Sequence, residues 1–192
     1  IRKAAFLWLL IISSIASADS SDFYNMSAQV GERSLDFRSY LFRVAERSNL
    51  SLIMAQNVRS KEKSVEGKTV REALNNYFKD TGFSYRLRNN CLYVAENEKL
   101  DLFLEKLPED AMLLPEGKGN ITISGIFHSI EIAVFCTILR NLTGVEIRSS
   151  DALKANLVIR LVKMPWKTVL VAVARLNGYR LIRTEFSVLV IP

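Results

Sequence analysis

One pattern occurs twice in this chain of 192 residues. The stretches KTVREALNNYFKDTGFSYRLRNNCLYVA (68–95) and KMPWKTVLVAVARLNGYRLIRTEFSVLVIP (163–192) each contain a helical apolar stripe, a glycine and two strand-like segments. The stripe positions are Val70, Ala73, Leu74, Tyr77 and Phe78 in the first stretch and Trp166, Val169, Leu170, Val173 and Ala174 in the second. Because each stripe must be buried on another element, the repeat predicts two similar units in which helices cover a sheet.

The residues before each stretch complete the two units. Apolar side chains at helical spacing predict a helix near residues 37–48 and another near 132–139. Strands are predicted at 50–54, 83–87 and 91–95 in the first unit and at 121–127, 145–148 and 156–162 in the second. Thr69 and Glu72 form a T-x-x-E capping box, and Gly82 and Gly178 suit the turn that ends each second helix. The expected fold class is therefore α+β, with two small βαββα-type sandwich domains in tandem.

The chain divides into four predicted segments. These are a signal peptide (1–18), a first domain (19–97), a linker (98–119) and a second domain (120–192). The linker is charged, contains Pro108 and Pro115, and is expected to hold one or two helical turns near Leu100 to Leu107.

The first eighteen residues, IRKAAFLWLLIISSIASA, have a basic start, a short apolar run and small residues at Ala16 and Ala18. This order is typical of a secretory signal peptide cleaved after Ala18, so the mature chain is expected to begin at Asp19 in the periplasm. A retained membrane anchor is the alternative, although the apolar run is shorter than the roughly 20 residues that span a bilayer. Without these residues and their two cations, 24 basic side chains face 20 acidic ones. Such a mild net charge of +4 does not indicate a nucleic-acid partner.

Few residues suggest catalysis. His128 is the only histidine, is expected at a strand-to-helix turn, and supports neither a Ser-His-Asp set nor a multi-histidine metal site. The chain has no P-loop, no G-x-G-x-x-G after a strand, and no G-x-x-G loop of the kind that nucleic-acid-binding KH domains need. We therefore expect no enzyme activity, no cofactor, no metal and no small-molecule substrate. Cys91 and Cys136 either form one bridge between the units or stay unpaired, with Cys136 buried as a small apolar side chain.

Two stretches carry a resemblance to a known family. The first unit, from FYNMSAQVGERSLDFRSYLFRVAERSNLSLIMAQNV through VREALNNYFKDTGFSYRLRNNCLYV, resembles the short secretin and TonB amino-terminal (STN, or N0) domain. The second unit, with MPW before its second helix and LTGVEI after its first, is similar to the periplasmic amino-terminal domains of type IV pilus secretins. Asn49 stands where the family often has glycine, whereas Gly144 keeps it.

The resemblance implies a function in the cell envelope. It suggests a non-enzymatic binding and assembly module of a secretion or type IV pilus machine, which contacts machine proteins or cargo and could form a homo-oligomeric ring. Secretins also contain further ring-building domains and a membrane β-barrel, so we expect a module without pore-forming capacity of its own. The alternative is an STN-type signalling domain of a TonB-linked regulatory system.

A partner-binding surface is predicted on the second helix of the second unit. Val171 and Ala172 stand where the first unit has Asn75 and Asn76. At 100° per residue, Val171 lies about 130° from the centre of the buried stripe, and Leu176 lies on a flank of the same side. We therefore expect Val171, Ala172 and Leu176 to be exposed, either as ordinary isolated apolar residues or as part of a partner contact. Val171→Asp is expected to leave folding nearly intact and to weaken association with a ring or partner.

Overall fold

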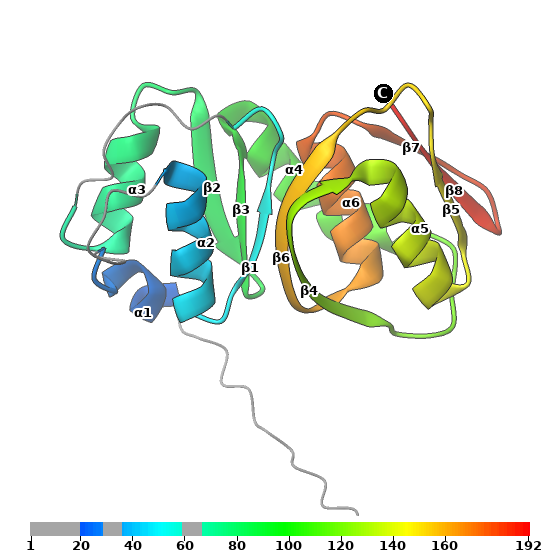
Figure 1. The fold of residues 1–192 in the computed structure, drawn as a ribbon, viewed down its shortest axis with the longest axis horizontal. Helices are drawn as coiled ribbons and strands as arrows, with labels where there is room; N and C mark the ends of the chain where they lie inside the picture. The colour runs from blue at the N-terminus through cyan, green and yellow to red at the C-terminus, as the bar shows by residue number, and fades with distance from the viewer. Residues whose placement is uncertain (1–19, 29–35, 59–66) are drawn as a thin grey trace, which may run out of the picture.

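The computed structural model describes residues 20–28, 36–58 and 67–192, and the predicted signal peptide lies outside these ranges. The chain has a mixed α/β fold with two sheets (Figure 1). The elements of the first half are α1 (Ser20–Asn25), α2 (Phe37–Arg47), β1 (Ser51–Met54), α3 (Val70–Phe78), β2 (Phe83–Arg88) and β3 (Cys91–Glu96). Those that follow are α4 (Asn97–Met112), β4 (Thr122–Glu131), α5 (Ile132–Thr143), β5 (Glu146–Ser149), β6 (Asn156–Pro165), α6 (Trp166–Leu176), β7 (Arg180–Arg183) and β8 (Ser187–Ile191).

Local sequence signals explain the helix ends. The Thr69 hydroxyl accepts a hydrogen bond from the Glu72 N–H at 3.3 Å, and the Glu72 carboxylate accepts one from the Lys68 N–H at 2.8 Å. The predicted capping box is thus present, with the glutamate bonded one residue before the cap. Asn49 follows α2 with a φ of +51°, and Gly144 follows α5 with a φ of +73°. Asparagine and glycine tolerate this left-handed backbone better than other residues do, which explains both residues at these positions.

The same three-strand arrangement occurs in both halves. β1 runs parallel to β3, which pairs antiparallel with β2. β5 likewise runs parallel to β8, which pairs antiparallel with β7. The repeated sequence pattern therefore corresponds to a repeated strand topology, with α3 and α6 preceding the matching hairpins.

The two halves share one sheet. β6 pairs antiparallel with β1 on one side and with β4 on the other, which gives the strand order β2-β3-β1-β6-β4. Side chains add to this junction, since Arg160 donates to the Leu50 carbonyl at 3.1 Å and the Ser51 hydroxyl accepts from the Val162 N–H at 2.9 Å. The sheet of the first half is thus extended by two strands from the second half.

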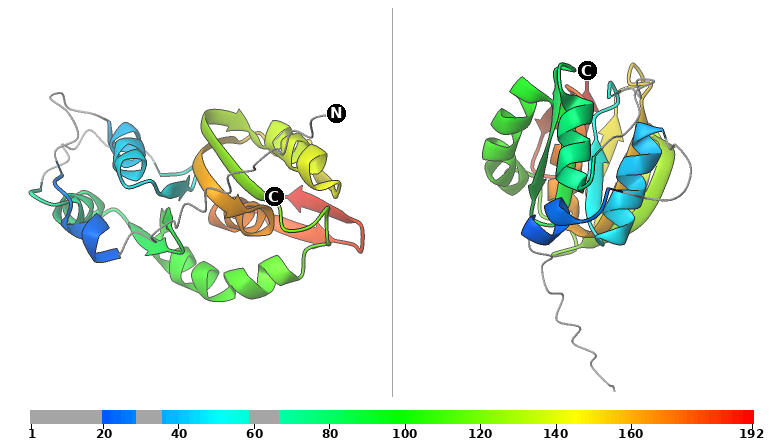
Figure 2. Two further views of the ribbon diagram at one scale, coloured as in Figure 1. Left: turned by 90° about the horizontal axis from the view of Figure 1, so that it is seen from below. Right: turned by 90° about the vertical axis from the view of Figure 1, so that its left-hand side faces the viewer.

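α4 occupies most of the segment that the sequence predicted to be a linker. The helix has 16 residues and is longer than the expected one or two turns. It buries Leu100, Phe103, Leu104 and Leu107, which are spaced as one helix face. Pro108 lies inside the helix and has no N–H for the Leu104 carbonyl four residues earlier, but the Arg88 guanidinium donates to that carbonyl. Figure 2 shows α4 running from the first half to the second, where it packs along α6.

The predicted exposure of Val171, Ala172 and Leu176 is wrong. Their exposed fractions are 0%, 0% and 3%. α4 and β1 contact α6 in addition to the helix's own strands β6 and β7. α6 is therefore buried on nearly all sides, as an all-round apolar helix requires, and it offers no partner surface at these residues.

Both cysteines are buried and unpaired. Cys91 lies in β3 and Cys136 on the buried face of α5. Burial raises the pKa of the Cys91 thiol, and it raises that of the Cys136 thiol to about 12. Neither thiol is therefore set up as a thiolate nucleophile at neutral pH.

We expect the folded protein to react slowly with a thiol reagent such as Ellman's reagent. Two thiols per chain should react rapidly once the protein is unfolded without a reductant, because the reagent needs an accessible thiolate. Fewer than two reactive thiols after unfolding would indicate a bridge and would contradict the arrangement described here.

Candidate interaction groove

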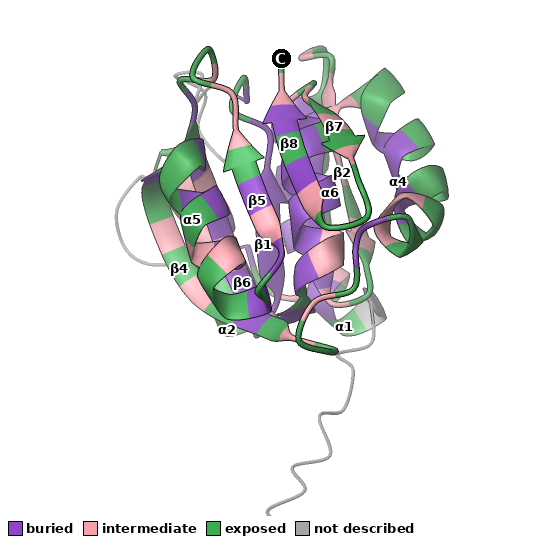
Figure 3. Cartoon of the chain, turned by 90° about the vertical axis from the view of Figure 1, so that its right-hand side faces the viewer, coloured by how far each residue is buried: buried purple, intermediate pink, exposed green. Residues whose placement is uncertain are grey.

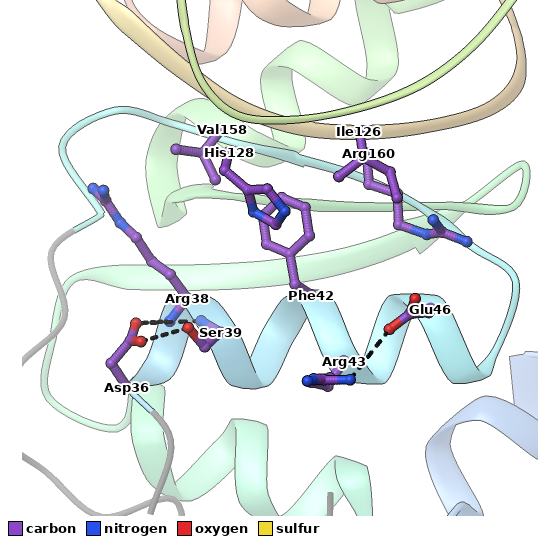
Figure 4. A pocket seen from close by; sticks show the side chains of 10 residues that line it. All are labelled: Asp36, Arg38, Ser39, Phe42, Arg43, Glu46, Ile126, His128, Val158 and Arg160. Carbon is purple, nitrogen blue, oxygen red and sulfur yellow. Dashed lines mark hydrogen bonds and ion pairs between the residues drawn. The ribbon is translucent and has the colours of Figure 1, made fainter.

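A groove of about 600 Å³ lies between α2 and the strand pair β4–β6 (Figure 4). Its first wall consists of Asp36, Arg38, Ser39, Phe42, Arg43 and Glu46, from α2 and its cap. Its second wall consists of Ile126 and His128 from β4 and Val158 and Arg160 from β6. The two walls come from different halves of the chain, so the groove exists because β6 pairs with β1.

An apolar surface lines the middle of the groove. The rings of Phe42 and His128 contact across it, with centroids 4.9 Å apart. Ile126 is 49% exposed and lies on the β4–β6 wall, as does the half-buried Val158. His128 lies within β4, so its predicted position at a strand-to-helix turn is wrong. This lining can receive an apolar side chain of a partner.

Cations border the apolar surface. Arg38 donates to the Val58 carbonyl at 2.8 Å and to the Gln56 carbonyl at 3.2 Å, and Arg160 donates to the Leu50 carbonyl. These contacts hold both guanidinium groups on neutral carbonyl acceptors, and the charge of Arg38 also acts on the nearby Asp36 carboxylate. Arg43 instead pairs with Glu46 at 3.8 Å on the exposed side of α2, a contact that contributes little energy. The fixed cations favour a partner that carries a carboxylate near its apolar side chain.

Asp36 has a structural role at the edge of the groove. It accepts hydrogen bonds from the Arg38 and Ser39 N–H groups, at 3.0 and 3.2 Å, and from the Ser39 hydroxyl at 2.5 Å. The bond from the Ser39 hydroxyl is the largest cause that lowers the pKa of the Asp36 carboxyl, and the backbone bonds lower it further. Although Ser39, His128 and Asp36 all line the groove, the serine donates directly to the aspartate, and the imidazole packs against the Phe42 ring in a tilted arrangement. A catalytic triad instead needs the histidine between the other two residues.

The cap makes stability depend on pH. Asp36→Ala is expected to lower the free energy of unfolding by about 1 kcal/mol at pH 7, a typical value for losing an N-cap. Because the folded-state pKa lies below the ordinary value of 3.8, the carboxylate stabilises the fold above that pH and loses its effect as the pH falls through the folded-state pKa.

Urea unfolding of wild type and Asp36→Ala between pH 7 and pH 2 measures the difference in their free energies of unfolding. This difference should shrink at the acid end of the range. Asp36→Asn is the matched control, because asparagine also caps helices but does not titrate near pH 4. A difference for Asp36→Ala that stays constant down to pH 2 would contradict the role given to the carboxylate.

The sequence prediction missed the groove. Phe42 lies off the buried stripe of α2, and Ile126 lies off the alternating core positions of β4. An apolar residue on the polar side of each element was the available signal. It did not show that the two elements face each other, because that follows from the pairing of β1 with β6.

Neither a cluster of metal ligands nor a membrane-spanning helix occurs within the described ranges. Among residues 20–28, 36–58 and 67–192, no group of three or more His, Cys, Asp or Glu side chains could hold a metal ion. In the same part of the chain, no helix combines the length and apolar character needed to cross a bilayer. No model of a known protein family matches this sequence, and no curated protein matches it either.

Proposed function

We propose that this chain is a non-enzymatic periplasmic binding and assembly module of an envelope secretion or type IV pilus machine. In this proposal it consists of two small α+β domains of the kind found at the amino termini of secretins, within 19–97 and 120–192. α4 lies in the connecting segment and holds the two domains together. The partners are proteins of the machine or its cargo, and no nucleic acid or cofactor is involved.

The observation that carries the proposal is the groove at the junction of the two halves. It combines an apolar lining with fixed cations, a combination suited to a protein segment with an apolar and an acidic side chain. β4 also forms one edge of the five-stranded sheet and borders the same groove. An extended partner segment can pair with such an edge while its side chains enter the groove.

The repeated topology supports the proposal independently. β1 of one half accepts β6 of the other at its edge, so units of this kind associate through strand pairing within this very chain. A module that already uses one sheet edge for internal assembly, and has another at β4, is suited to assembly with further proteins.

Site-specific photocrosslinking in the native envelope tests this function. A photoreactive amino acid at Ile126, inside the groove, is compared with one at Val134 on α5, because both positions are 49% exposed. We expect adducts with a secretion or pilus component from position 126 and none from position 134. Adducts with a TonB-linked regulator would favour the signalling alternative. Equal labelling from both positions would contradict the groove as the binding site.

A further inference from the structure

The three-stranded sheet β5-β8-β7 has an exposed outer face, which faces the viewer in Figure 3. Ile182 of β7 and Leu189 of β8 are cross-strand partners on this face, with exposed fractions of 49% and 36%. Phe186, in the turn between these strands, is 74% exposed. Neighbouring exposed apolar side chains on one sheet face make that face a candidate contact surface.

The equivalent face in the first half is covered. There the matching cross-strand pair is Arg86 of β2 and Tyr93 of β3. α4 lies over this pair: Asp101 bonds Arg86 at 2.9 Å, and the Phe103 ring meets the Tyr93 ring edge-on at 5.6 Å. Tyr93 is consequently only 1% exposed. The chain itself therefore shows what covers such a face, namely a helix with apolar and acidic side chains.

The exposed face is also bordered by cations. Arg148 of β5 lies beside Leu189 in the strand register, and its side chain is 70% exposed. Arg148 shares the Glu146 carboxylate with Arg140, at 2.6 and 3.5 Å, so two cations face one anion. Arg180 is exposed at the start of β7 and donates to the Pro192 carbonyl at 3.3 Å, and Glu185 is exposed in the turn between β7 and β8. Three arginines (Arg140, Arg148 and Arg180) thus border two carboxylates (Glu146 and Glu185), and this excess of positive charge favours an acidic partner.

The outward side of α4 has the complementary character. Leu102 is 54% exposed, and Met112 at the end of the helix is 81% exposed. Three exposed carboxylates flank them on the same side, at positions 98, 105 and 109. Residues 98, 102, 105, 109 and 112 are spaced as one helix face, which lies opposite the buried stripe of α4. Two lysines, Lys99 and Lys106, lie at the margin of this side, and Lys99 pairs with Glu96.

From these observations we infer that the outer face of β5-β8-β7 binds the outward side of α4 of a second copy of this chain. Leu102 contacts Ile182 and Leu189, while the carboxylates of α4 face Arg148 and Arg180. The two surfaces differ, so the contact is head-to-tail and leaves one free surface of each kind on a pair of copies. The inference deepens the proposed assembly function, but it concerns self-association and needs no other component.

Sedimentation velocity of the purified protein over a range of concentrations tests the inference. Wild type should form species that grow beyond dimers as the concentration rises. Leu102→Lys and Leu189→Asp should each weaken association at least tenfold, roughly the effect of 1.4 kcal/mol. Val134→Asp on α5 is the control and should assemble as wild type does. All three positions are exposed, so the substitutions should leave the fold intact. Circular dichroism of each variant checks that it is folded.

A mixture of the two variants gives the sharpest result. The Leu102→Lys copy keeps an intact sheet face and the Leu189→Asp copy keeps an intact α4, so the mixture should form heterodimers and stop there. The double reversals Glu105→Lys with Glu109→Lys, and Arg148→Glu with Arg180→Glu, should each abolish assembly and restore it when mixed. A wild-type chain that stays monomeric, or variants that assemble as wild type does, would overturn the inference. Neither result bears on crosslinking at Ile126, so the proposed function stands or falls separately.

Discussion

Val171→Asp is expected to lower the free energy of unfolding by about 3 kcal/mol or more, because it places an unpaired carboxylate in a fully buried position. Val171 is 0% exposed, and α6 is enclosed by α4, β1 and its own strands. Chemical unfolding monitored by circular dichroism measures the effect. This large loss replaces the near-neutral effect that the sequence pattern alone predicted.

The matched control for this variant is Asn75→Asp. Asn75 occupies the corresponding position of α3, is exposed, and accepts a hydrogen bond from the Tyr85 hydroxyl that an aspartate can also accept. Its effect should stay within about 0.5 kcal/mol, as is usual for exposed positions. If Val171→Asp proves as mild as Asn75→Asp, Val171 is not enclosed between α6 and its neighbours as described.

Asp110→Asn is expected to lower the free energy of unfolding by about 2 kcal/mol. Asp110 of α4 bonds Arg175 of α6 and Arg183 of β7, each at 3.0 Å. Its side chain is 15% exposed and that of Arg183 is 20% exposed, so little water reaches the pair. The buried Nε of Arg183 has no hydrogen-bond partner, which makes this guanidinium depend on Asp110. Removing the carboxylate charge leaves a largely buried cation poorly compensated.

Asp101→Asn is the matched comparison for Asp110→Asn. Asp101 lies on the same helix and pairs with Arg86 at the same kind of distance, 2.9 Å, but the two side chains are 64% and 44% exposed. Water screens that pair, so its loss should cost about 0.5 kcal/mol or less. Equal effects of the two substitutions in thermal or urea unfolding would show that Asp110 does not fasten α4 to the second half.

The sequence predicted the elements whose signals are local. The apolar stripes of α2, α3 and α5, the hairpin β2–β3 and the turn glycines all occur where their patterns indicated them. Such patterns reflect 3.6-residue and two-residue periods, which neighbouring residues alone determine. The repeat also predicted the same order of a helix and two strands in both halves, and the structure has this order in α3-β2-β3 and α6-β7-β8.

The errors concern contacts between the halves. The charged residues and Pro108 of 98–119 suggested a linker, although Leu100, Phe103, Leu104 and Leu107 have the spacing of a helix face. Proline is tolerated there because Arg88, a residue of β2, bonds the carbonyl that loses its helical partner. A single-segment pattern cannot reveal such a distant donor. Without a helix in residues 98–119, the sequence pattern offers no element to cover Val171 and predicts that it lies at the surface.

The candidate groove depends on the same long-range arrangement. Phe42 and Ile126 each interrupt a polar side of their own element, but only the β1–β6 pairing brings them to opposite walls. The resemblance to secretin amino-terminal domains indicated a binding role without indicating which surface binds. The groove and the exposed face of β5-β8-β7 are therefore contributions of the three-dimensional structure.

The two halves form one body through the β1–β6 junction, and amide hydrogen exchange of the native protein tests this arrangement most directly. Leu52, Ile53 and Met54 of β1 face Arg160, Ile159 and Val158 of β6 in an antiparallel register. We predict that amides in this junction exchange as slowly as those between β2 and β3, and much more slowly than amides at the open edge of β4. Junction amides that exchange as rapidly as that open edge, while the β2–β3 amides stay protected, would show that the two halves are separate bodies and would contradict the shared sheet.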